Sequence, residues 1–466
     1  MAKKKPTSKN KQNLKDTLGE SAVAKKGHDS ESPMMNASIH SKDDEQQPEP
    51  ALISTEEEAK EGHLHNAITS DKKDSQEEKK RDLAEIAELW GKMDDEKDLA
   101  NILNKALQVL YGKDAKAINA GWLKHMARKS PYLSFRIPKK KKGKYRNIDA
   151  PAKSLKNIQQ ALNLVFQQIY TPHAAAMGFV PNRSVVDNAQ AHLGQRFVYN
   201  IDLKDFFPSI SSGRLYKRLM SKPFCLNGIL ASLISDLCCF KNKDGKKVLP
   251  QGAPTSPTIT NFICERLDIK LTKLAKAYKL KYTRYADDIT FSGMGNMFSP
   301  EGKFCTSLRN IIENEESFLI NGEKTRVCHR GMRQEVTGLT VNSKTNVSRK
   351  YIKQLRTLIH NWEVKGYDEA QAIFAEHYKE TNTRHLLSKG EHYIENIISG
   401  KLMYLKMVKG EMDNTYRALS LRFNSLLETR FGIKKAVPNI ENPDEDKVIL
   451  DELTNLSDLL ENNTIR

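Results

Sequence analysis

Apolar residues follow a helical spacing along residues 81–130. Steps of three or four residues between apolar positions are those of one face of an α-helix. The spacing runs through Leu83, Ile86, Leu89, Trp90, Leu99, Ile102, Leu103, Leu107 and Leu110. It predicts two or three short helices at the start of the folded part of the chain.

Beyond residue 131 the pattern changes to short segments in which apolar and polar residues alternate, as they do in half-buried β-strands. Residues 132–137 and 145–148 alternate on either side of a lysine-rich turn at residues 139–144, and this arrangement predicts a basic hairpin. Further strands are expected at residues 197–201, 279–285, 289–292 and 336–341.

Helical spacing returns at residues 155–170 and again over residues 348–431, where the helices are basic. No internal repeat is evident in the chain. The mixture of helices and short strands indicates an α+β fold.

The two ends of the chain have a different composition. Residues 1–80 are rich in Lys, Ser, Asp, Glu and Gln, so they cannot bury enough apolar surface to offset the entropy cost of ordering. We expect them to form a disordered extension. Residues 436–466 form an acidic tail, whose apolar residues have the spacing of one amphipathic helix: Val448, Ile449, Leu453, Leu456, Leu459 and Leu460.

The net charge favours a polyanionic partner. The chain has 75 Lys and Arg residues against 58 Asp and Glu residues, a formal charge of +17. Residues 1–80 contribute 14 basic and 16 acidic side chains, so the remaining residues carry +19. Such an excess favours nucleic acid, because neutralising phosphates releases counterions.

Cysteine use and hydropathy bear on the compartment. The six cysteines contain no Cys-x-x-Cys pair and lie in apolar surroundings, so we expect reduced core thiols and neither a zinc site nor a disulfide framework. No apolar stretch approaches the length of a membrane span, and the first residues lack the hydrophobic segment of a signal peptide. We therefore expect a cytoplasmic protein with no membrane partner.

Paired carboxylates are the main chemical signal. Asp287 and Asp288 stand between two expected strands, and Asp202 ends the strand at residues 197–201. An Asp-Asp pair in a turn is commonly just a solvated turn. Acids at the ends of neighbouring strands would repel unless cations neutralise them, and Mg²⁺ prefers such oxygen ligands. If the strands are adjacent, the three acids suit two metal ions about 3.5–4 Å apart.

A Pro- and Gly-rich loop, Leu249–Pro257, lies between the two acidic segments. Gly252 would permit close approach of the backbone to a ligand, and the prolines fix a loop before a helix expected to begin near Thr258. A rigid loop at a helix start suits phosphates and bases. An ordinary helix-capping loop is the alternative.

In this order the motifs resemble those of reverse transcriptases. Residues Asp202–Phe207 are similar to the first metal motif of that family, and Leu249–Pro257 to its template- and nucleotide-binding loop. Tyr285–Asp288 matches its YxDD box, and Glu323–Arg326 resembles the motif that follows. Five ordered matches, including the basic hairpin, make the resemblance specific.

The resemblance implies a right-hand polymerase fold of the α+β class. It is close over residues 131–345, which would form the fingers and an antiparallel-sheet palm. It is looser over residues 346–430, within a basic helical thumb expected at residues 346–435. The helices of residues 81–130 would precede the fingers.

The resemblance also implies roles for single residues. Two Mg²⁺ ions, for which Mn²⁺ can substitute, would be held by Asp202, Leu203, Asp287 and Asp288. Asp202 and Asp287 are the expected direct ligands, with Asp288 behind them. Lys324 would protonate the pyrophosphate leaving group. The expected dNTP-binding residues are Lys144, Arg146, Gln251 and Phe207, the last as the steric gate that excludes a ribose 2′-OH.

Two further motifs resemble signatures of retron reverse transcriptases. Asn188–His192 is similar to the NAxxH signature, and Val336, Thr337 and Gly338 to the VTG signature. We expect these residues, with Arg349 and Lys350 on the thumb, to recognise structured RNA. His192 is assigned no proton-transfer role.

Retron membership implies copying of a cognate non-coding RNA from the 2′-OH of a guanosine in it. The product is branched RNA-linked DNA (msDNA), made in antiphage defence with a separate effector protein. A group II intron-like or diversity-generating reverse transcriptase is one alternative. A noncatalytic RNA-binding scaffold is another, which Asp202, Asp287, Asp288, Gln251 and Lys324 argue against.

Overall fold

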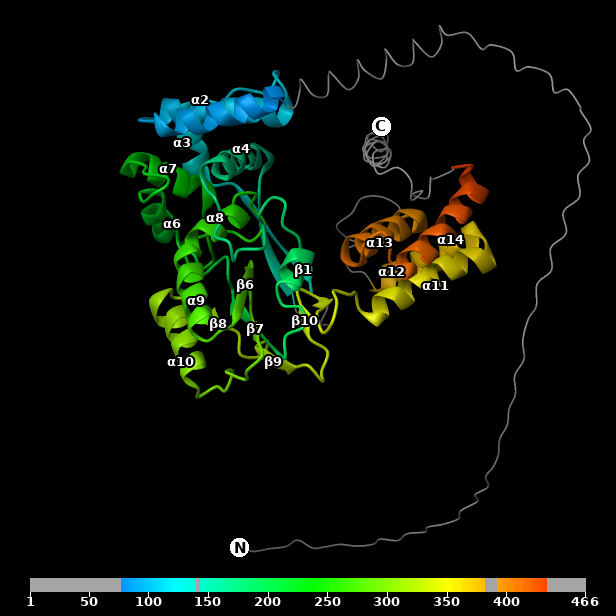
Figure 1. Ribbon diagram of the computed structural model, residues 1–466. Helices are drawn as coiled ribbons and strands as arrows, with labels where there is room; N and C mark the ends of the chain where they lie inside the picture. The colour runs from blue at the N-terminus through cyan, green and yellow to red at the C-terminus, as the bar shows by residue number, and fades with distance from the viewer. Residues whose placement is uncertain (1–76, 140–142, 144, 382–391, 434–466) are drawn as a thin grey trace, which may run out of the picture. The chain divides into compact units, whose positions relative to one another are not determined.

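The structure is a computed structural model, and it describes residues 77–139, 143, 145–381 and 392–433 (Figure 1). The expected disorder of residues 1–76 and the helix expected in the acidic tail lie outside these residues. Residues 77–80 correct the expected extension, because they are helical and belong to the helix over residues 77–91.

Three helices precede the strands. The helix over residues 77–91 is followed by α2 (Glu96–Tyr111) and α3 (Ala120–Lys129). Asp95 caps α2 through the backbone amides of Lys97 and Asp98, which satisfies donors that the first turn leaves unpaired. The apolar stripe of α2 is buried as its spacing predicts, and α2 packs on α4 (Lys153–Ile169).

The basic hairpin is present. Strands β1 (Tyr132–Pro138) and β2 (Tyr145–Pro151) pair antiparallel along their whole length. The backbone amide of Asp149 in β2 donates to the carbonyl oxygen of Gln251 at 2.9 Å, which ties the hairpin to the loop before α8. The next elements along the chain that lie outside the central sheet are α5 (Val185–Gln190), α6 (Ser212–Leu219), α7 (Gly228–Cys238), β4 (Phe240–Lys241), β5 (Lys247–Val248) and α8 (Ser256–Ile263).

One antiparallel sheet forms the centre of this part of the chain (Figure 1). Its strands are β3 (Phe197–Lys204), β6 (Lys281–Tyr285), β7 (Asp288–Gly293), β8 (Leu319–Ile320) and β9 (Arg326–His329). β3 lies in the middle: β7 and then β6 follow on one side, while β8 and β9 pair with different parts of β3 on the other. The sheet thus joins segments more than 100 residues apart.

One face of the sheet is apolar and carries helices. Tyr199, Phe291 and Tyr282 are register partners across β3, β7 and β6, so they share a face. The ring of Phe291 lies edge-on to Phe304 at 5.2 Å between centroids, and Tyr282 donates to Asp268 at 2.7 Å. These contacts hold α9 (Glu265–Ala277) and α10 (Lys303–Arg309) on that face; a π-helical segment, η1 (Asn310–Glu315), follows α10.

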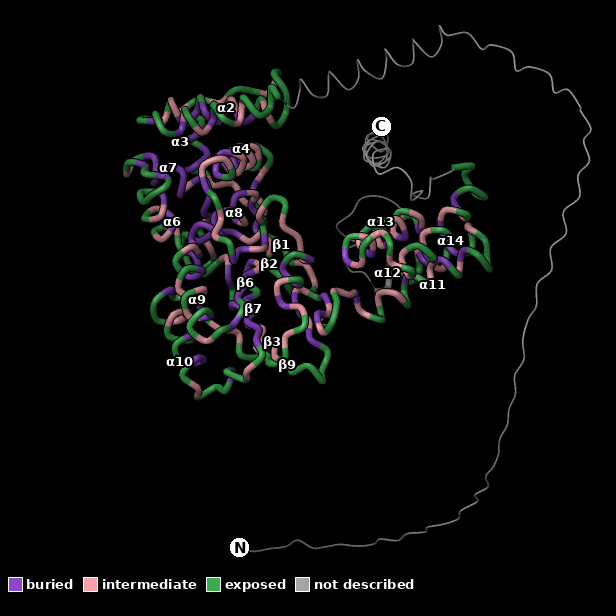
Figure 2. The backbone as a smooth tube through the Cα atoms, in the orientation of Figure 1, coloured by how far each residue is buried: buried purple, intermediate pink, exposed green. Residues whose placement is uncertain are grey.

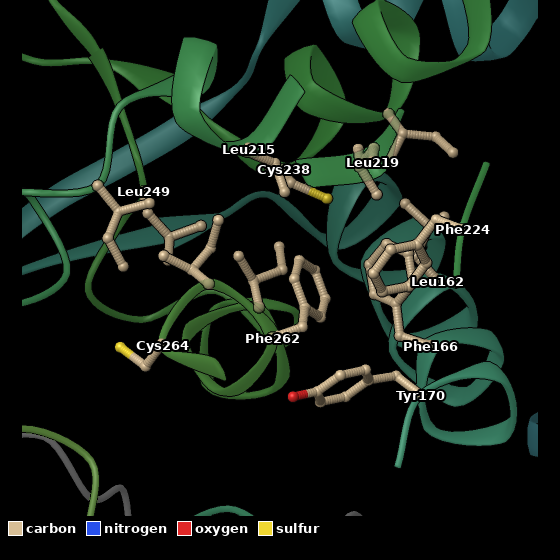
Figure 3. Packing of buried hydrophobic residues seen from close by; sticks show 14 of the residues in the cluster. Leu162, Phe166, Tyr170, Leu215, Leu219, Phe224, Cys238, Leu249, Phe262 and Cys264 are labelled. Carbon is tan, nitrogen blue, oxygen red and sulfur yellow. The ribbon is translucent and has the colours of Figure 1, made fainter. Parts of the chain in front are cut away.

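An aromatic cluster forms the centre of the hydrophobic core (Figure 3). Phe166 of α4 contacts Phe224 and Phe262 edge-on, at 6.0 and 5.5 Å between ring centroids, and Tyr170 stacks on Phe224. The indole of Trp90 donates to the carbonyl of Phe224. The cluster therefore joins the first helix, α4 and α8.

The strand expected at residues 336–341 is wrong in form. The segment is a tight hairpin of β10 (Glu335–Val336) and β11 (Leu339–Thr340), with Thr337 and Gly338 between them. Both turn residues have positive φ, 47° and 83°, as the type I′ turn that suits such hairpins requires. Alternation alone did not reveal the reversal.

The basic C-terminal segment is helical, as its spacing predicts. It comprises α11 (Arg349–Lys365), α12 (Tyr367–Thr381), α13 (Ile394–Lys409) and α14 (Asn414–Phe431). Figure 2 shows that buried and exposed residues alternate along these helices. Trp362 of α11 packs edge-on against Phe423 of α14, at 5.9 Å between ring centroids. None of the helices in the described ranges is long and apolar enough to cross a membrane.

The cysteines follow the expectation with one exception. Cys238, Cys239, Cys264, Cys305 and Cys328 are buried free thiols. Cys225 is free but exposed, which corrects the expectation of a core position.

The antiparallel sheet, the hairpin and the helical segment confirm the α+β class and the palm, fingers and thumb of a right-hand polymerase fold.

Removing the buried carboxylate of Asp268 should destabilise the protein strongly. Asp268 and Arg284 are both fully buried and paired at 2.6 Å, so Asp268→Ala leaves a guanidinium charge without its partner. We expect a loss of about 3–5 kcal/mol in unfolding free energy, measured by urea denaturation. The control is Glu369→Ala, which breaks the exposed Lys365–Glu369 pair and should cost under about 1 kcal/mol. Equal losses would contradict this.

Candidate active site

The sheet register brings the three acids to one end of the sheet. β6 and β7 form a hairpin with Ala286 and Asp287 in its turn, here called the catalytic hairpin (residues 281–293). Asp202 of β3 pairs directly with Asp288 of β7, and the amide of Leu203 donates to the carbonyl of Asp287 at 3.0 Å. We call Asp202, Asp287 and Asp288 the carboxylate cluster.

This register also bears on how the acids share their task. Side chains of directly paired residues lie on the same face and close together. Asp288 therefore reaches Asp202, although Asp287 was the expected direct ligand and Asp288 its support. The division of ligand roles between Asp287 and Asp288 stays a prediction, as does the role of Leu203.

The turn of the catalytic hairpin is closely supported. Ala286 is buried with a φ of +56°, a conformation that costs a residue with a side chain some free energy. Gly178 lies against it: a Cβ added there would lie 2.7 Å from the Ala286 nitrogen. Residues 175–177 run beside β6, where Arg284 donates its amide to Ala175 and accepts from Met177.

A buried guanidinium connects these pieces. Arg284 pairs with Asp268 of α9 and also donates to the carbonyl of Ala286, at 3.2 Å. It donates to Asn261 as well, whose amide in turn donates to the carbonyl of Gly178 at 3.0 Å. One ionised side chain thus fixes the catalytic turn, α9 and the segment that covers the turn.

Asp202 is engaged by two donors. Its carboxylate accepts from the ammonium of Lys324 at 2.6 Å and from the side-chain amide of Asn321 at 2.9 Å. Partial burial disfavours the charge of Lys324, but the bond to Asp202 and the charges of Asp287 and Asp288 outweigh it and raise the pKa of Lys324. Lys324 is therefore protonated at neutral pH and lies where it could donate a proton.

The other two acids are electrostatically strained. Desolvation, followed by the charge of Asp202, raises the pKa of Asp287. Desolvation and the charges of Asp287 and Asp202 raise the pKa of Asp288 to about 6, although its side chain is partly open to solvent. Cations that approach the cluster relieve this repulsion.

The donor set suits hard divalent cations. Carboxylate oxygens are the ligands that Mg²⁺ takes, usually one or two of them together with substrate phosphates. Within the described ranges, no three His, Cys, Asp or Glu side chains are already grouped as a metal site. Asp202 is instead turned towards Lys324 and Asn321. The three carboxylates therefore fit such ions by the chemistry of their oxygen atoms.

The expected nucleotide-binding residues lie in different surroundings. The positive charge of Arg146, at the turn end of the β1–β2 hairpin, favours the ionised form of Asp287, so that end of the hairpin lies near the carboxylate cluster. Phe207 is half-buried against Phe206 and Phe179, and Phe206 itself lies in the core. Gln251 is partly exposed. Lys144 lies outside the described residues.

The loop before α8 packs on the β1–β2 hairpin. Gly252, with φ of +136°, lies against β2: a Cβ there would lie 2.9 Å from Ile148 and 3.1 Å from the Asp149 carbonyl. Its approach to a ligand stays a prediction. The helix begins at Ser256, two residues before the expected Thr258, because Pro257 fits its first turn.

The expected RNA-recognition residues divide into two groups. Asn188, His192 and Val336 are at most 1% exposed, so the expectation that their side chains contact RNA directly is wrong for this structure. Thr337 is half-buried and Gly338 exposed, at a turn.

Arg349 and Lys350, the thumb residues expected to recognise RNA, are exposed at the start of α11. For these two residues, and for the turn at Thr337 and Gly338, recognition stays a prediction.

Several supporting residues escaped the sequence analysis. Arg284 offered a usable signal, since a charge within a strand of Tyr and Thr three residues before the acids requires a buried partner. Asn321 comes three residues before Lys324, but nothing in the sequence pairs it with Asp202. Gly178 and Asn261 carry no local pattern, because their roles arise from packing between distant segments.

Divalent cations should stabilise the protein more at pH 8 than at pH 5. The raised pKa of Asp288 means that the folded state keeps a proton that the unfolded state loses. Without cations, this group's contribution therefore falls as pH rises from about 4 to about 6. Mg²⁺ competes with that proton. Thermal unfolding should show a larger rise in midpoint with millimolar Mg²⁺ at the higher pH, and a smaller one for Asp288→Asn. Equal rises at both pH values would contradict this.

Comparison with known proteins agrees with this geometry. Residues 137–363 match the family model for reverse transcriptase (RNA-dependent DNA polymerase). The chain is 40% identical over 257 residues to the retron Mx162 reverse transcriptase of Myxococcus xanthus, covering 49% of this chain and 52% of the relative. It is 34% identical over 219 residues to the retron Ec86 reverse transcriptase of Escherichia coli, covering 46% and 65%. These matches span less than two thirds of either relative. Residues 137–363 are therefore similar to reverse transcriptases, among them those of bacterial retrons.

Proposed function

We propose that the chain is an RNA-directed DNA polymerase that works with divalent metal ions. The observation that carries the proposal is the carboxylate cluster, with Asp202 opposite Asp288, Asp287 in the turn and Lys324 bonded to Asp202. A scaffold that only binds RNA gains nothing from acids that raise each other's pKa. The similarity to retron reverse transcriptases supports the same activity.

The proposed reaction is nucleotidyl transfer. A primer hydroxyl attacks the α-phosphorus of a dNTP, the bond from that phosphorus to the bridging oxygen breaks, and pyrophosphate leaves. When bound, Mg²⁺ ions would stabilise the negative charge on the attacking and leaving oxygens. Asp202, Asp287 and Asp288 would hold these ions. Lys324, protonated at neutral pH, would give a proton to the pyrophosphate.

Neighbouring residues would select the nucleotide. Arg146, whose charge reaches Asp287, would hold the triphosphate. Phe207 would exclude a ribose 2′-OH, and its ring is backed by Phe206 and Phe179 at 5.6 and 6.4 Å between centroids. Rigid backing favours such a steric role, because a gate that moves discriminates poorly.

The template would be the structured non-coding RNA of a retron. Synthesis would start from the 2′-OH of a guanosine in that RNA and yield branched msDNA, in antiphage defence with a separate effector protein. The thumb supports an RNA partner: Arg349, Lys353, Arg356 and His360 are exposed along one side of α11. They line a groove of about 670 Å³, and the three cations among them, Arg349, Lys353 and Arg356, suit a phosphate backbone.

Loss of one carboxylate should abolish DNA synthesis. Asp202→Asn and Asp287→Asn each remove a negative charge that the metal ions need, so we expect at least a ~10³-fold lower rate of primer extension. RNA binding should remain, because the cationic face of α11 is unchanged. The measurement is extension of an annealed primer, with filter binding of the same RNA as control. Extension near the wild-type rate by either variant would refute the proposal.

Substitution of Gly178 should impair the same reaction without touching a ligand. The Cβ of Gly178→Ala would lie 2.7 Å from the backbone of Ala286, so the turn that carries Asp287 must shift. A displacement of about 1 Å can cost roughly 100-fold in rate.

The matched control for Gly178→Ala is Gly400→Ala in α13, where an added Cβ meets nothing within 4 Å. Primer extension should fall at least about tenfold for Gly178→Ala and stay at the wild-type rate for the control. Full activity of Gly178→Ala would show that the turn tolerates the movement.

A further inference from the structure

A polar layer lies directly next to the carboxylate cluster. Side chains on a strand alternate between faces, so the face that bears Asp202 and Asp288 next bears Asn200, Thr290 and Thr283, which are register partners across the three strands. Thr290 donates to Asn200 at 3.1 Å. Thr283 and Thr290 are almost fully buried. This face of the catalytic hairpin is therefore held by specific hydrogen bonds where an apolar core would pack without direction.

His192 joins the two strands of the catalytic hairpin from outside the sheet. Its Nε2 lies 2.7 Å from the hydroxyl of Thr283 in β6, and its Nδ1 lies 2.7 Å from the hydroxyl of Ser292 in β7. The ring is fully buried, and desolvation lowers the pKa of His192 to about 3. The imidazole is therefore neutral at physiological pH. Both ring nitrogens thus have the partner that burial requires, and each partner belongs to a different strand of the catalytic hairpin.

The same hydrogen bonds continue to the second signature. Thr283 donates to the side-chain oxygen of Asn188 at 2.6 Å, and the Asn188 amide donates to the hydroxyl of Thr337 at 3.4 Å. Thr337 donates to the backbone carbonyl of Val185 at 3.3 Å. Asn188 and His192 of the NAxxH motif and Thr337 of the VTG motif thus belong to one continuous series of hydrogen bonds.

The direction of every proton follows from the last acceptor. A carbonyl can only accept, so the Thr337 proton is used there and Thr337 must accept from Asn188. The Asn188 oxygen then faces Thr283 and takes its only proton. Thr283 must accept from His192, which fixes the proton on Nε2 and leaves Nδ1 to accept from Ser292. One arrangement satisfies all members.

We propose that Asn188, His192 and Thr337 are positioning residues that hold the catalytic hairpin in register through this single hydrogen-bond chain, here called the positioning chain. The polymerase role of the hairpin rests on the function proposed above. The positioning chain runs from Val185 in α5 to both strands that lead to Asp287 and Asp288. It gives Asn188, His192 and Thr337 a task inside the protein, and Asn188 and His192 are buried.

The test compares two substitutions of Thr283. Thr283→Val keeps the volume and removes the hydroxyl, so Nε2 of His192 and the oxygen of Asn188 both lose their partner. Thr283→Ser keeps the hydroxyl and removes only a methyl group. Unpaired buried polar groups are costly, so only the first should loosen the hairpin. Rates are measured well below the melting temperature of each variant.

We expect kcat for extension of an annealed primer to fall at least about tenfold in Thr283→Val, with KM for dNTP within about twofold of wild type. Thr283→Ser should restore the rate. The loss should be the same in self-primed synthesis on a cognate RNA. Two readouts need no catalysis: faster amide exchange in residues 281–293 of Thr283→Val only, and ¹⁵N NMR of His192 that shows the Nε2–H tautomer in the wild type.

Each outcome decides the matter. Wild-type kcat and amide exchange in Thr283→Val would overturn the positioning chain, and a loss confined to the cognate RNA would assign these residues to recognition. A Nδ1–H tautomer would overturn the proton order. If the wild type makes no DNA, the proposed function fails while exchange and NMR still test the chain. Should Thr283→Val fail to fold, Ser292→Ala takes its place in the same measurements, because it removes the hydroxyl that donates to Nδ1 of His192.

Discussion

Repulsion between acids is the constraint around which this part of the structure is built. Asp202, Asp287 and Asp288 are brought together by the register of β3 with β7, and no rearrangement within that register separates them. Lys324 and Asn321 bind Asp202, and Arg146 and Arg326 act on the other two acids. The remaining repulsion is a favourable feature for a site that must attract cations, because their binding removes it.

Holding such a site requires rigidity on both faces of the sheet. The helix-bearing face supplies it with a buried ion pair, Arg284 with Asp268, from which further bonds reach the turn. The opposite face supplies it with neutral hydrogen bonds around His192. The fully buried ion pair thus lies on the face opposite to the one that bears Asp202 and Asp288.

The sequence was informative where a pattern is local. Strand alternation located β3 and the catalytic hairpin, and the spacing of apolar residues located α2, α4 and the thumb helices. The order of motifs identified the carboxylates. The prediction failed mainly in the burial of Asn188 and His192. Both are polar residues, and their hydrogen-bond partners lie about 90 or more positions away in the sequence. Composition near such residues resembles that of a surface.

The prediction of one continuous strand over residues 336–341, where the chain turns at Thr337 and Gly338, failed for another reason. Its flanking strands have two residues each, too short for alternation to show that the chain reverses. A positive φ at two successive residues is a property of the backbone that only the glycine hints at.

The buried guanidinium of Arg284 limits how this architecture can vary. Its planar group serves Asp268 with two nitrogens and also reaches Asn261 and the Ala286 carbonyl. A lysine ammonium has three donors on one atom and cannot reproduce that fork, so even the exchange of one cation for the other leaves acceptors unpaired. Loss of Arg284 would also strand the carboxylate of Asp268. A substitution at Arg284 or at Asp268 is therefore tolerated only together with a substitution at the other position, so the two positions are coupled in evolution.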